Sequence, residues 1–265
     1  MNLQTKRIKE LFGYARTLTR EQGLAPMLGR AAGFFRRRLL GKRARYWPSK
    51  RALAAQRAAD TSAFPLISIL TPLYNTPPRF LQQFLDSVQA QTAPNWQLVL
   101  VDASDSAHAE PGRLAQERAA QDSRILYRKI GNGGIAANTN AAAALAGGDY
   151  LALADHDDML APHAVYCMGK ALAETGADFA YSDEALFEKT PRRPRVGHFK
   201  PDYAPEYLMA VNYICHLAVF RRSLYEAVGG ERPACDGAQA HDLFMRLIDE
   251  LQRLDPAAKH LNIPQ

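Results

Sequence analysis

The sequence predicts an α/β domain built on a mostly parallel sheet with helices on both faces. From about residue 65 onward, short apolar runs alternate with longer segments of helical character. Connections of this length favour parallel pairing, because antiparallel neighbours need only a short turn. The 265 residues are 47% hydrophobic and 23% charged, which is typical of a globular protein. A basic arm precedes the domain.

Five strands are expected, each a short apolar or β-branched run. They are residues 66–70, 96–102, 124–129, 150–155 and 178–183. Helices are expected between them. The first has an apolar stripe from Phe80 to Val88, the second ends near Gln121, the third opens at Gly134, and the fourth runs from Pro162 to Glu174.

The composition excludes several classes of protein. The 17 Gly and 16 Pro are too few for collagen-like sequence, and the three separated cysteines argue against a disulfide framework or a zinc knuckle. No apolar run approaches the ~18 residues of a membrane span. The start, MNLQTKRIKE, lacks the apolar core of a signal peptide. We therefore expect a cytoplasmic protein.

Residues 1–64 form the expected basic helical arm. Residues 1–60 hold 15 of the 33 Lys and Arg residues but only 3 of the 27 Asp and Glu residues, a local net charge of +12, which leaves −6 for residues 61–265. The arm is interpreted as an extension that packs on its own domain or a partner, as a membrane-surface helix, or as a nucleic-acid contact. The acidic domain limits the last idea to the arm, and we expect no nucleic-acid partner.

Acidic residues end three of the expected strands, at Asp102, Asp155 and Asp183. Ligands of open parallel sheets bind outside the carboxyl ends of the strands, and a divalent cation relieves the repulsion between clustered carboxylates. In the turn ADHDD we expect Asp155 and Asp157 to act on a metal and a nucleotide, since Mg²⁺ is usually held by one or two carboxylates and substrate phosphates. Asp158 is expected to cap the following helix.

A Gly-rich segment, GNGGIAANTN at residues 131–140, opens the third expected helix. Free backbone N–H groups at a helix start attract phosphate, but a simple tight turn explains the pattern equally well. The segment matches neither GxGxxG nor the P-loop, so dinucleotide-binding and P-loop functions lose support.

Eight motifs occur in one order between Pro65 and Leu254. They are SILTPLYN (68–75), LVLVDAS (98–104), NGGIAANTN (132–140), GGDYLALADHDD (147–158), YSDE (181–184), FKPDYAPEYL (199–208), NYICHLAVFRRSL (212–224) and DGAQAHDLFMRL (236–247). Together they resemble the family 2 glycosyltransferases, which have a Rossmann-like GT-A fold. The sequence is most similar to bacterial polysaccharide and O-antigen transferases, including rhamnosyltransferases.

The resemblance implies a GT-A domain over residues 65–265 and a role for each matching residue. The domain is expected to be truncated at its C-terminal end, because relatives usually continue beyond the step at Ile263-Pro264. The implied nucleotide-binding residues are Pro72, Tyr74, Asp102, Asn132, Gly134 and Asp155. The implied ligands of Mg²⁺ or Mn²⁺ are Asp157 and Asp155. The implied donor- and acceptor-binding residues are Asp183, Glu184 and His216, although a satisfied buried histidine explains His216 equally well.

The general base is implied to lie in the acidic motif AQAHD at residues 238–242. The common form of this motif has an acid where this chain has Ala240, which leaves Asp242 as the expected base. If the base belongs at the first position, this protein lacks it. The alternative to an active enzyme is then a catalytically impaired nucleotide- and metal-binding module that acts with a partner.

The implied reaction is inverting transfer of a sugar from a UDP- or dTDP-sugar to a hydroxyl of a glycan or lipid-linked glycan, in cell-surface polysaccharide synthesis. A nucleotidyltransferase is disfavoured, because LYNTPPRF stands where that class needs a Gly-rich loop with a basic residue. The expected location is cytoplasmic, and peripheral contact of residues 1–60 with the inner face of the membrane is a hypothesis.

Overall fold

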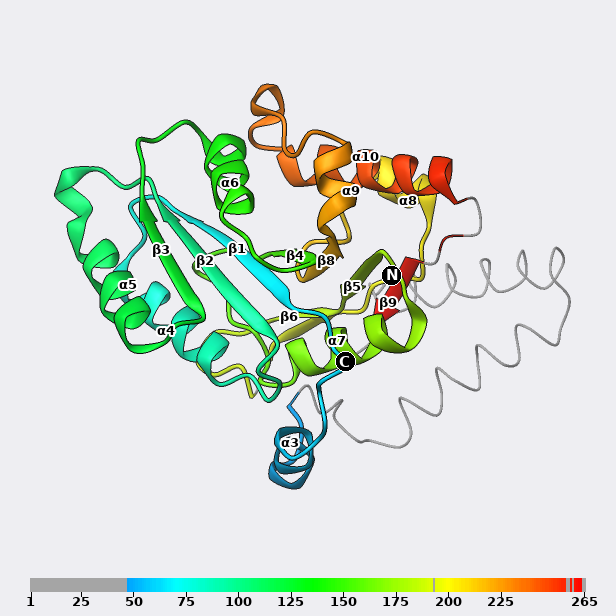
Figure 1. The fold of residues 1–265 in the computed structure, drawn as a ribbon, viewed down its shortest axis with the longest axis horizontal. Helices are drawn as coiled ribbons and strands as arrows, with labels where there is room; N and C mark the ends of the chain where they lie inside the picture. The colour runs from blue at the N-terminus through cyan, green and yellow to red at the C-terminus, as the bar shows by residue number, and fades with distance from the viewer. Residues whose placement is uncertain (1–46, 193, 256–257, 259, 264–265) are drawn as a thin grey trace, which may run out of the picture. The chain divides into compact units, whose positions relative to one another are not determined.

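The computed structural model describes residues 47–192, 194–255, 258 and 260–263, so the predictions made for residues 1–46 lie outside the described residues. The described chain centres on a seven-stranded sheet in the order β3-β2-β1-β4-β8-β5-β9 (Figure 1). The strands are β1 (Ile67–Leu73), β2 (Trp96–Asp102), β3 (Ile125–Lys129), β4 (Tyr150–Leu153), β5 (Phe179–Ser182), β8 (Ala218–Arg221) and β9 (His260–Ile263).

The sheet is mostly parallel, as predicted. Strand β1 pairs in parallel with β2 and β4, β2 with β3, and β5 with β9. Each of the five expected strands forms, with ends shifted by a few residues. Two strands of the sheet are not among those predicted: β9, which is parallel to β5, and β8, which lies between β4 and β5 and is antiparallel to both. Alternation of strand and helix along the chain does not predict that a later strand inserts between two earlier ones.

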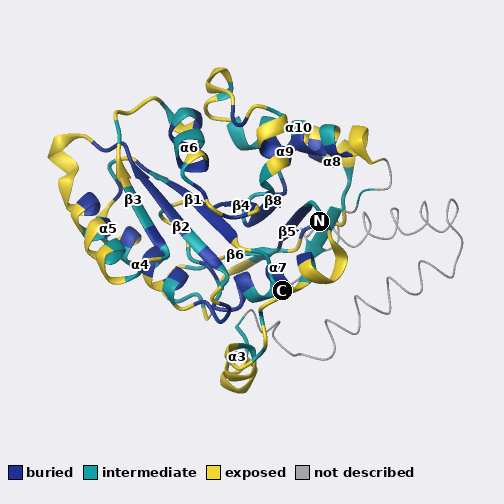
Figure 2. Ribbon diagram, viewed as in Figure 1, coloured by how far each residue is buried: buried dark blue, intermediate teal, exposed yellow. Residues whose placement is uncertain are grey.

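Helices cover both faces of the sheet (Figure 1). One apolar core lies under α4 (Pro78–Gln89), α5 (Ala109–Gln121) and α7 (Ala164–Thr175). The core on the other face lies under α6 (Ile135–Ala144), α8 (Pro205–Ala210), α9 (Arg222–Ala227) and α10 (Gln239–Leu254). Figure 2 shows the central strands buried between these two layers. The remaining elements are α3 (Lys50–Arg57), the 3₁₀ turns η1 (Ser106–His108) and η2 (Pro233–Cys235), and the β6 (Glu184–Leu186) and β7 (Val196–His198) pair.

Helix α10 carries the acidic motif in its first turn. Its buried positions, Leu243, Phe244, Leu247, Ile248 and Leu251, recur at the spacing of one helix face. This stripe packs into the core over the sheet, so the opposite side of the first turn is left for polar contacts.

The described part of the basic arm packs on the domain. The side-chain oxygen of Gln56 on α3 accepts a hydrogen bond from the Thr92 hydroxyl at 3.0 Å, and the Phe64 ring meets Tyr166 at 5.5 Å between centroids. These two contacts join the described end of the arm to the domain, and the role of the arm as a whole stays a prediction. Among the described residues, no helix combines the length and apolar character that crossing a membrane requires.

Candidate active site

The register of β4 against β8 brings Asp155 and His216 together. Leu153 at the end of β4 pairs with Ala218 at the start of antiparallel β8. Asp155 lies two residues beyond Leu153, and His216 lies two residues before Ala218, so both leave the sheet at the same edge. Their side chains meet there, with Nε2 of His216 3.5 Å from Oδ2 of Asp155.

Asp158 completes a three-residue cluster. Its Oδ2 lies 3.5 Å from Nδ1 of His216, and one ligand atom from each of Asp155, Asp158 and His216 lies within 4.8 Å of the others. Partial desolvation of the Asp158 side chain, which is 54% exposed, raises its pKa against the opposing charge of His216. Burial alone would lower the pKa of His216, but hydrogen bonding to Cys215 and the negative charges of the cluster raise it to about 9. The cluster therefore favours a positive charge between its two carboxylates.

The acids of the ADHDD turn that meet in the cluster are Asp155 and Asp158, whereas the prediction paired Asp155 with Asp157. Helix α7 begins at Ala164 with His163 as its N-cap residue, so the expected capping by Asp158 is wrong. Asp158 joins Asp155 in the cluster because its backbone N–H donates to the Asp155 carbonyl at 3.3 Å, which closes the turn. The Asp157 side chain is 58% exposed, and its ion-pair contact is with neighbouring His156 at 4.0 Å. The role of Asp157 as a metal ligand stays a prediction.

Glu184 and Asp183 support the cluster from the end of β5. Oε2 of Glu184 accepts from the backbone N–H of His216 at 2.8 Å, and Oδ1 of Asp183 accepts from the backbone N–H of Lys200 at 2.8 Å. The buried Lys200 ammonium donates to the carbonyls of Ile214 and His216, both at 2.9 Å. Burial lowers the pKa of Lys200. These contacts fix the loop that presents His216, and Lys200 is a positioning residue that the sequence analysis missed.

Two cavities meet at the cluster. The larger, of about 390 Å³, is lined by the cluster members Asp155 and His216. Pro72 from β1, Thr139 from α6, Glu231 from the loop after α9, and residues 237–241 at the start of α10 also line it. The smaller, of about 180 Å³, is lined by Asp158, Asp183, Glu184 and His216, together with apolar side chains. His216 lines both cavities.

Asp102 is held at the end of β2, beside Leu73 of β1. Its Oδ1 accepts from the Ser104 N–H at 2.9 Å, and its Oδ2 accepts from the Tyr127 hydroxyl at 2.8 Å and the Lys129 ammonium at 3.1 Å. Burial would raise the pKa of Asp102, but these hydrogen bonds outweigh it and lower the pKa. Its contact with a nucleotide base stays a prediction, as does that of Tyr74, which is 51% exposed.

The Gly-rich loop is closed by a residue from far along the chain. The backbone N–H of Ala136 on α6 donates to Oδ1 of Asp236 at 3.0 Å, so a carboxylate of the protein lies at the helix start expected to attract phosphate. Gly134 has φ +91°, and a Cβ there would lie 2.3 Å from Asp236. Asn132 accepts from the N–H of Gly134 and from the Asn138 amide, both at 3.0 Å. These contacts favour the tight-turn interpretation, and nucleotide binding by Asn132 and Gly134 stays a prediction.

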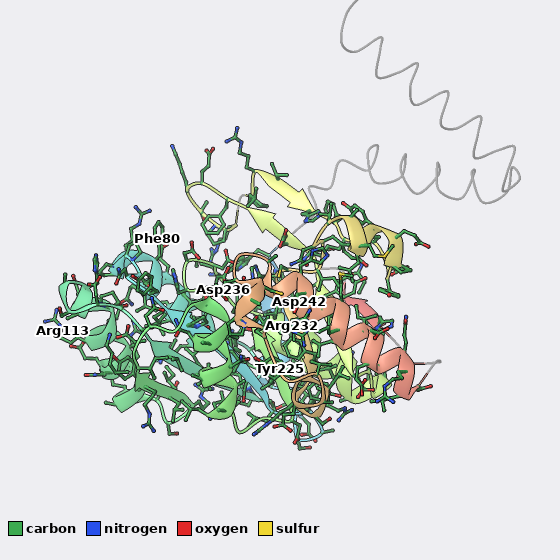
Figure 3. The ribbon with its side chains drawn as sticks, turned by 90° about the horizontal axis from the view of Figure 1, so that it is seen from above. Phe80, Arg113, Tyr225, Arg232, Asp236 and Asp242 are labelled. Carbon is green, nitrogen blue, oxygen red and sulfur yellow. The ribbon has the colours of Figure 1, made fainter. Side chains whose placement is uncertain are left out.

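Asp242, the expected base, is bound by two arginines. It accepts hydrogen bonds from Arg232, which precedes α10 and is labelled beside Asp242 in Figure 3. It also accepts from Arg246, one turn along the helix, at 2.8–2.9 Å. Hydrogen bonding from Arg232 and Arg246 lowers the pKa of Asp242 to about 2, against the smaller effect of burial. A carboxylate this weakly basic is a poor proton acceptor near neutral pH. Its catalytic role stays a prediction.

Glu231 is the acid that the sequence analysis missed. It is 3% exposed, it lines the larger cavity, and its Oε2 has no hydrogen-bond partner among the described residues. Burial raises the pKa of Glu231 to about 7. Its flanking sequence, GGERPA, reads as an exposed turn, so only the folded structure places it in the cavity.

The sheet edge, the acidic cluster and the cavities together define an α/β protein with a candidate ligand site at the carboxyl ends of the strands. Residues 68–229 match the family described as Glycosyl transferase family 2, and the chain belongs to this family.

Two curated relatives are similar over most of the chain. The uncharacterized protein y4gI of Sinorhizobium fredii is 37% identical over 215 residues, which is 78% of this chain and 23% of y4gI. The O-antigen biosynthesis protein RfbC of Myxococcus xanthus is 36% identical over 205 residues, which is 76% of this chain and 16% of RfbC. The chain thus spans less than a quarter of the length of either relative.

Two solved structures share the fold at low sequence identity. S. aureus TarS 1–349 in complex with UDP-GlcNAc has a TM-score of 0.55 and 16% identity, covering 68% of this chain and 52% of that one. The mannosyltransferase PcManGT from Pyrobaculum calidifontis, in complex with GDP-Man and Mn²⁺, has a TM-score of 0.53 and 19% identity, covering 90% of this chain and 65% of that one. The predicted GT-A fold is confirmed.

Proposed function

We propose that the chain transfers a sugar from a UDP- or dTDP-sugar to a hydroxyl of a glycan or lipid-linked glycan, with inversion, in cell-surface polysaccharide synthesis. The observation that carries the proposal is the Asp155–Asp158–His216 cluster at the junction of two cavities, in a chain of the family 2 glycosyltransferases. The similarity to an O-antigen biosynthesis protein supports the polysaccharide setting.

The donor is proposed to lie along the carboxyl edge of the sheet. Its base would face the ends of β1 and β2, where Pro72, Tyr74 and Asp102 lie, and its diphosphate would reach the cluster. The sugar would then enter the larger cavity. UDP-GlcNAc in the TarS structure and GDP-Man in the PcManGT structure support a nucleotide-sugar as the donor class.

The cluster has the donor set of a divalent cation. Two carboxylates and one imidazole offer oxygen and nitrogen ligands within 4.8 Å of one another, which suits Mn²⁺ or Mg²⁺ with substrate phosphates filling the remaining positions. A bound cation would supply Lewis-acid stabilisation of the charge that develops on the leaving diphosphate. The Mn²⁺ in the PcManGT structure supports this proposal.

The proposed reaction is a single displacement at the anomeric carbon of the donor sugar. The acceptor oxygen forms a bond to the anomeric carbon, the bond from that carbon to the diphosphate breaks, and its electron pair leaves with the diphosphate oxygen. A single attack on the face opposite the leaving group inverts the anomeric centre. The cavity walls must hold the two reactants in line and exclude water, which would otherwise hydrolyse the donor.

Turnover of defined donors tests this function. The protein is incubated with UDP- and dTDP-sugars and simple alcohol or glycoside acceptors, with Mn²⁺, Mg²⁺ or EDTA. We measure release of UDP or dTDP, and the anomeric configuration of the product by NMR. We expect metal-dependent release and a product of opposite configuration to the donor. Retained configuration would contradict inversion, and absence of both binding and release would contradict the donor class.

A further inference from the structure

The loop between α9 and η2 builds a buried carboxylate into the larger cavity. Glu231 follows Gly230, whose φ of +71° turns the chain inward, and the Glu231 residue is 97% buried. A Cβ at Gly230 would lie 2.5 Å from the Asn140 side chain, so the backbone here approaches α6 very closely.

Hydrogen bonds fix the backbone of Glu231 and of the preceding residue. Asn140 on α6 clamps the residue, because its Oδ1 accepts from the Glu231 N–H at 2.9 Å and its Nδ2 donates to the Glu231 carbonyl at 2.7 Å. Arg246 on α10 donates to the Gly230 carbonyl at 2.7 Å. Contacts from two different helices therefore hold the backbone of Glu231 in place at the cavity wall.

One oxygen of the Glu231 carboxylate has no hydrogen-bond partner among the described residues, although Thr139 hydrogen-bonds to the carboxylate. Its Oε2 is buried without a hydrogen bond among the described residues, whereas a carboxylate that stabilises a fold is normally paired. The groups that face it are Thr139 on α6, Tyr225 on α9, Asp236 in the following loop, Asp155 beyond β4, and Arg246 on α10. Burial is the main cause that raises the pKa of Glu231 to about 7, close to the working pH of a general base.

Neither Ala240 nor Asp242, the two positions of the AQAHD motif where an acid is expected, is suited to accept a proton. Ala240 lines the same cavity but has no titratable group, and both oxygens of Asp242 accept from arginines. Glu231, with one oxygen free of hydrogen bonds among the described residues, lines the same cavity as Ala240, Asp155 and His216, so its carboxylate can meet an acceptor hydroxyl that enters this cavity.

We propose that Glu231 is the catalytic base of this chain, replacing an acid at position 240. The role rests on the proposed sugar transfer. The Glu231 carboxylate takes the proton of the acceptor hydroxyl as the acceptor oxygen bonds to the anomeric carbon, and the diphosphate leaves with the electron pair of the broken bond. The protonated Glu231 then returns its proton to water.

The test compares the pH dependence of turnover in matched variants. Wild type, Glu231→Gln, Glu231→Asp and the exposed control Glu226→Gln are assayed for UDP or dTDP release from UDP- and dTDP-sugars, with water and alcohols as acceptors. Calorimetric binding of UDP with Mn²⁺ checks that each variant keeps its donor site. We expect Glu231→Gln to lose about 10²–10⁴-fold in kcat while binding UDP with unchanged affinity.

The pH profile separates a base from a merely structural residue. We expect kcat/KM of the wild type and of Glu226→Gln to rise with pH through an inflection near 7, because the base must be ionised. The inflection should persist in Glu231→Asp at a lower rate and disappear in Glu231→Gln. Turnover of Glu231→Gln within threefold of the wild type would overturn the role, as would an inflection that survives in this variant.

Failure of the proposed function itself is distinguishable. A wild type that binds neither UDP nor dTDP overturns sugar transfer and the role of Glu231 with it. A wild type that binds UDP but releases no UDP or dTDP from the donors likewise overturns both. A wild type that turns over while Glu231→Gln keeps its rate overturns the role of Glu231 alone.

Discussion

Glu231, in the loop after α9, and Asp242, in the first turn of α10, are close in sequence, but their surroundings shift their pKa values in opposite directions. The Glu231 carboxylate is buried beside other acids, and burial raises its pKa to about 7. The Asp242 carboxylate is bound by Arg232 and Arg246, which lower its pKa to about 2. Proton transfer near neutral pH suits the first environment, whereas the second suits an ion pair that joins α10 to its preceding loop.

Replacement of Asp242 by Asn is expected to destabilise the fold by about 1–3 kcal/mol at pH 7, because it removes charged hydrogen bonds to two arginines. The pKa of Asp242 is lowered on folding, so its stabilisation is present above the unfolded pKa near 3.8 and is lost as pH falls towards 2. Urea denaturation at pH 7, 5 and 3 measures this, with exposed Asp249→Asn on the same helix as the control.

The difference between wild type and Asp242→Asn should shrink between pH 5 and pH 3. A constant difference across this range would mean that the ion pairs do not stabilise the folded state. If Asp242→Asn instead abolishes turnover while UDP binding and stability are kept, the sequence-based assignment of the base is correct and Glu231 is not the base.

At the scale of elements, the start of α6 is held by its contact with η2. Asp236, just after η2 (Pro233–Cys235), accepts from the N–H of Ala136, and Gly134 leaves the space that this carboxylate occupies. The contact connects the Gly-rich loop to the segment that carries Glu231, so it supports two walls of the larger cavity.

Gly134→Ala is expected to lower the free energy of unfolding by about 1–2 kcal/mol or more. The positive φ alone costs roughly that much for a residue with a Cβ, and the new methyl group would also meet Asp236. Gly131→Ala is the matched control, because a Cβ there has nothing within 4 Å, and we expect a change within about 0.5 kcal/mol. Equal melting temperatures for the two variants would contradict this account of the loop.

Local pattern predicts elements well but not their long-range neighbours. The strands that end at Asp102 and Asp183 follow from short apolar runs, and Asp155 is correctly expected at a strand end. His216 joins Asp155 only through the antiparallel pairing of β8 with β4, which no local signal predicts. Asp158 and Glu231 are missed for the same reason: their roles depend on a turn closing and on burial by segments distant in sequence.

At the scale of the whole molecule, the sheet edge gathers every group that the proposed reaction needs. The proposed cation ligands follow β4 and precede β8, the acids that contact their loop follow β5, and the loops next to α6 and α10 line the larger cavity. The central claim is that Asp155, Asp158 and His216 hold a cation on which the diphosphate of the donor binds.

Calorimetric titration of UDP and dTDP, with and without Mn²⁺ or Mg²⁺, tests this claim most directly. The proteins are the wild type, Asp158→Ala, Asp157→Ala and the control Asp86→Ala, whose side chain on α4 is 54% exposed like that of Asp158. We predict metal-dependent binding in the wild type and the control, and at least about tenfold weaker binding in Asp158→Ala, because one cation ligand is lost. Asp157→Ala tests the prediction from the sequence that Asp157 is also a metal ligand. Unchanged metal-dependent affinity in Asp158→Ala, or wild-type binding that ignores the metal, would contradict the account.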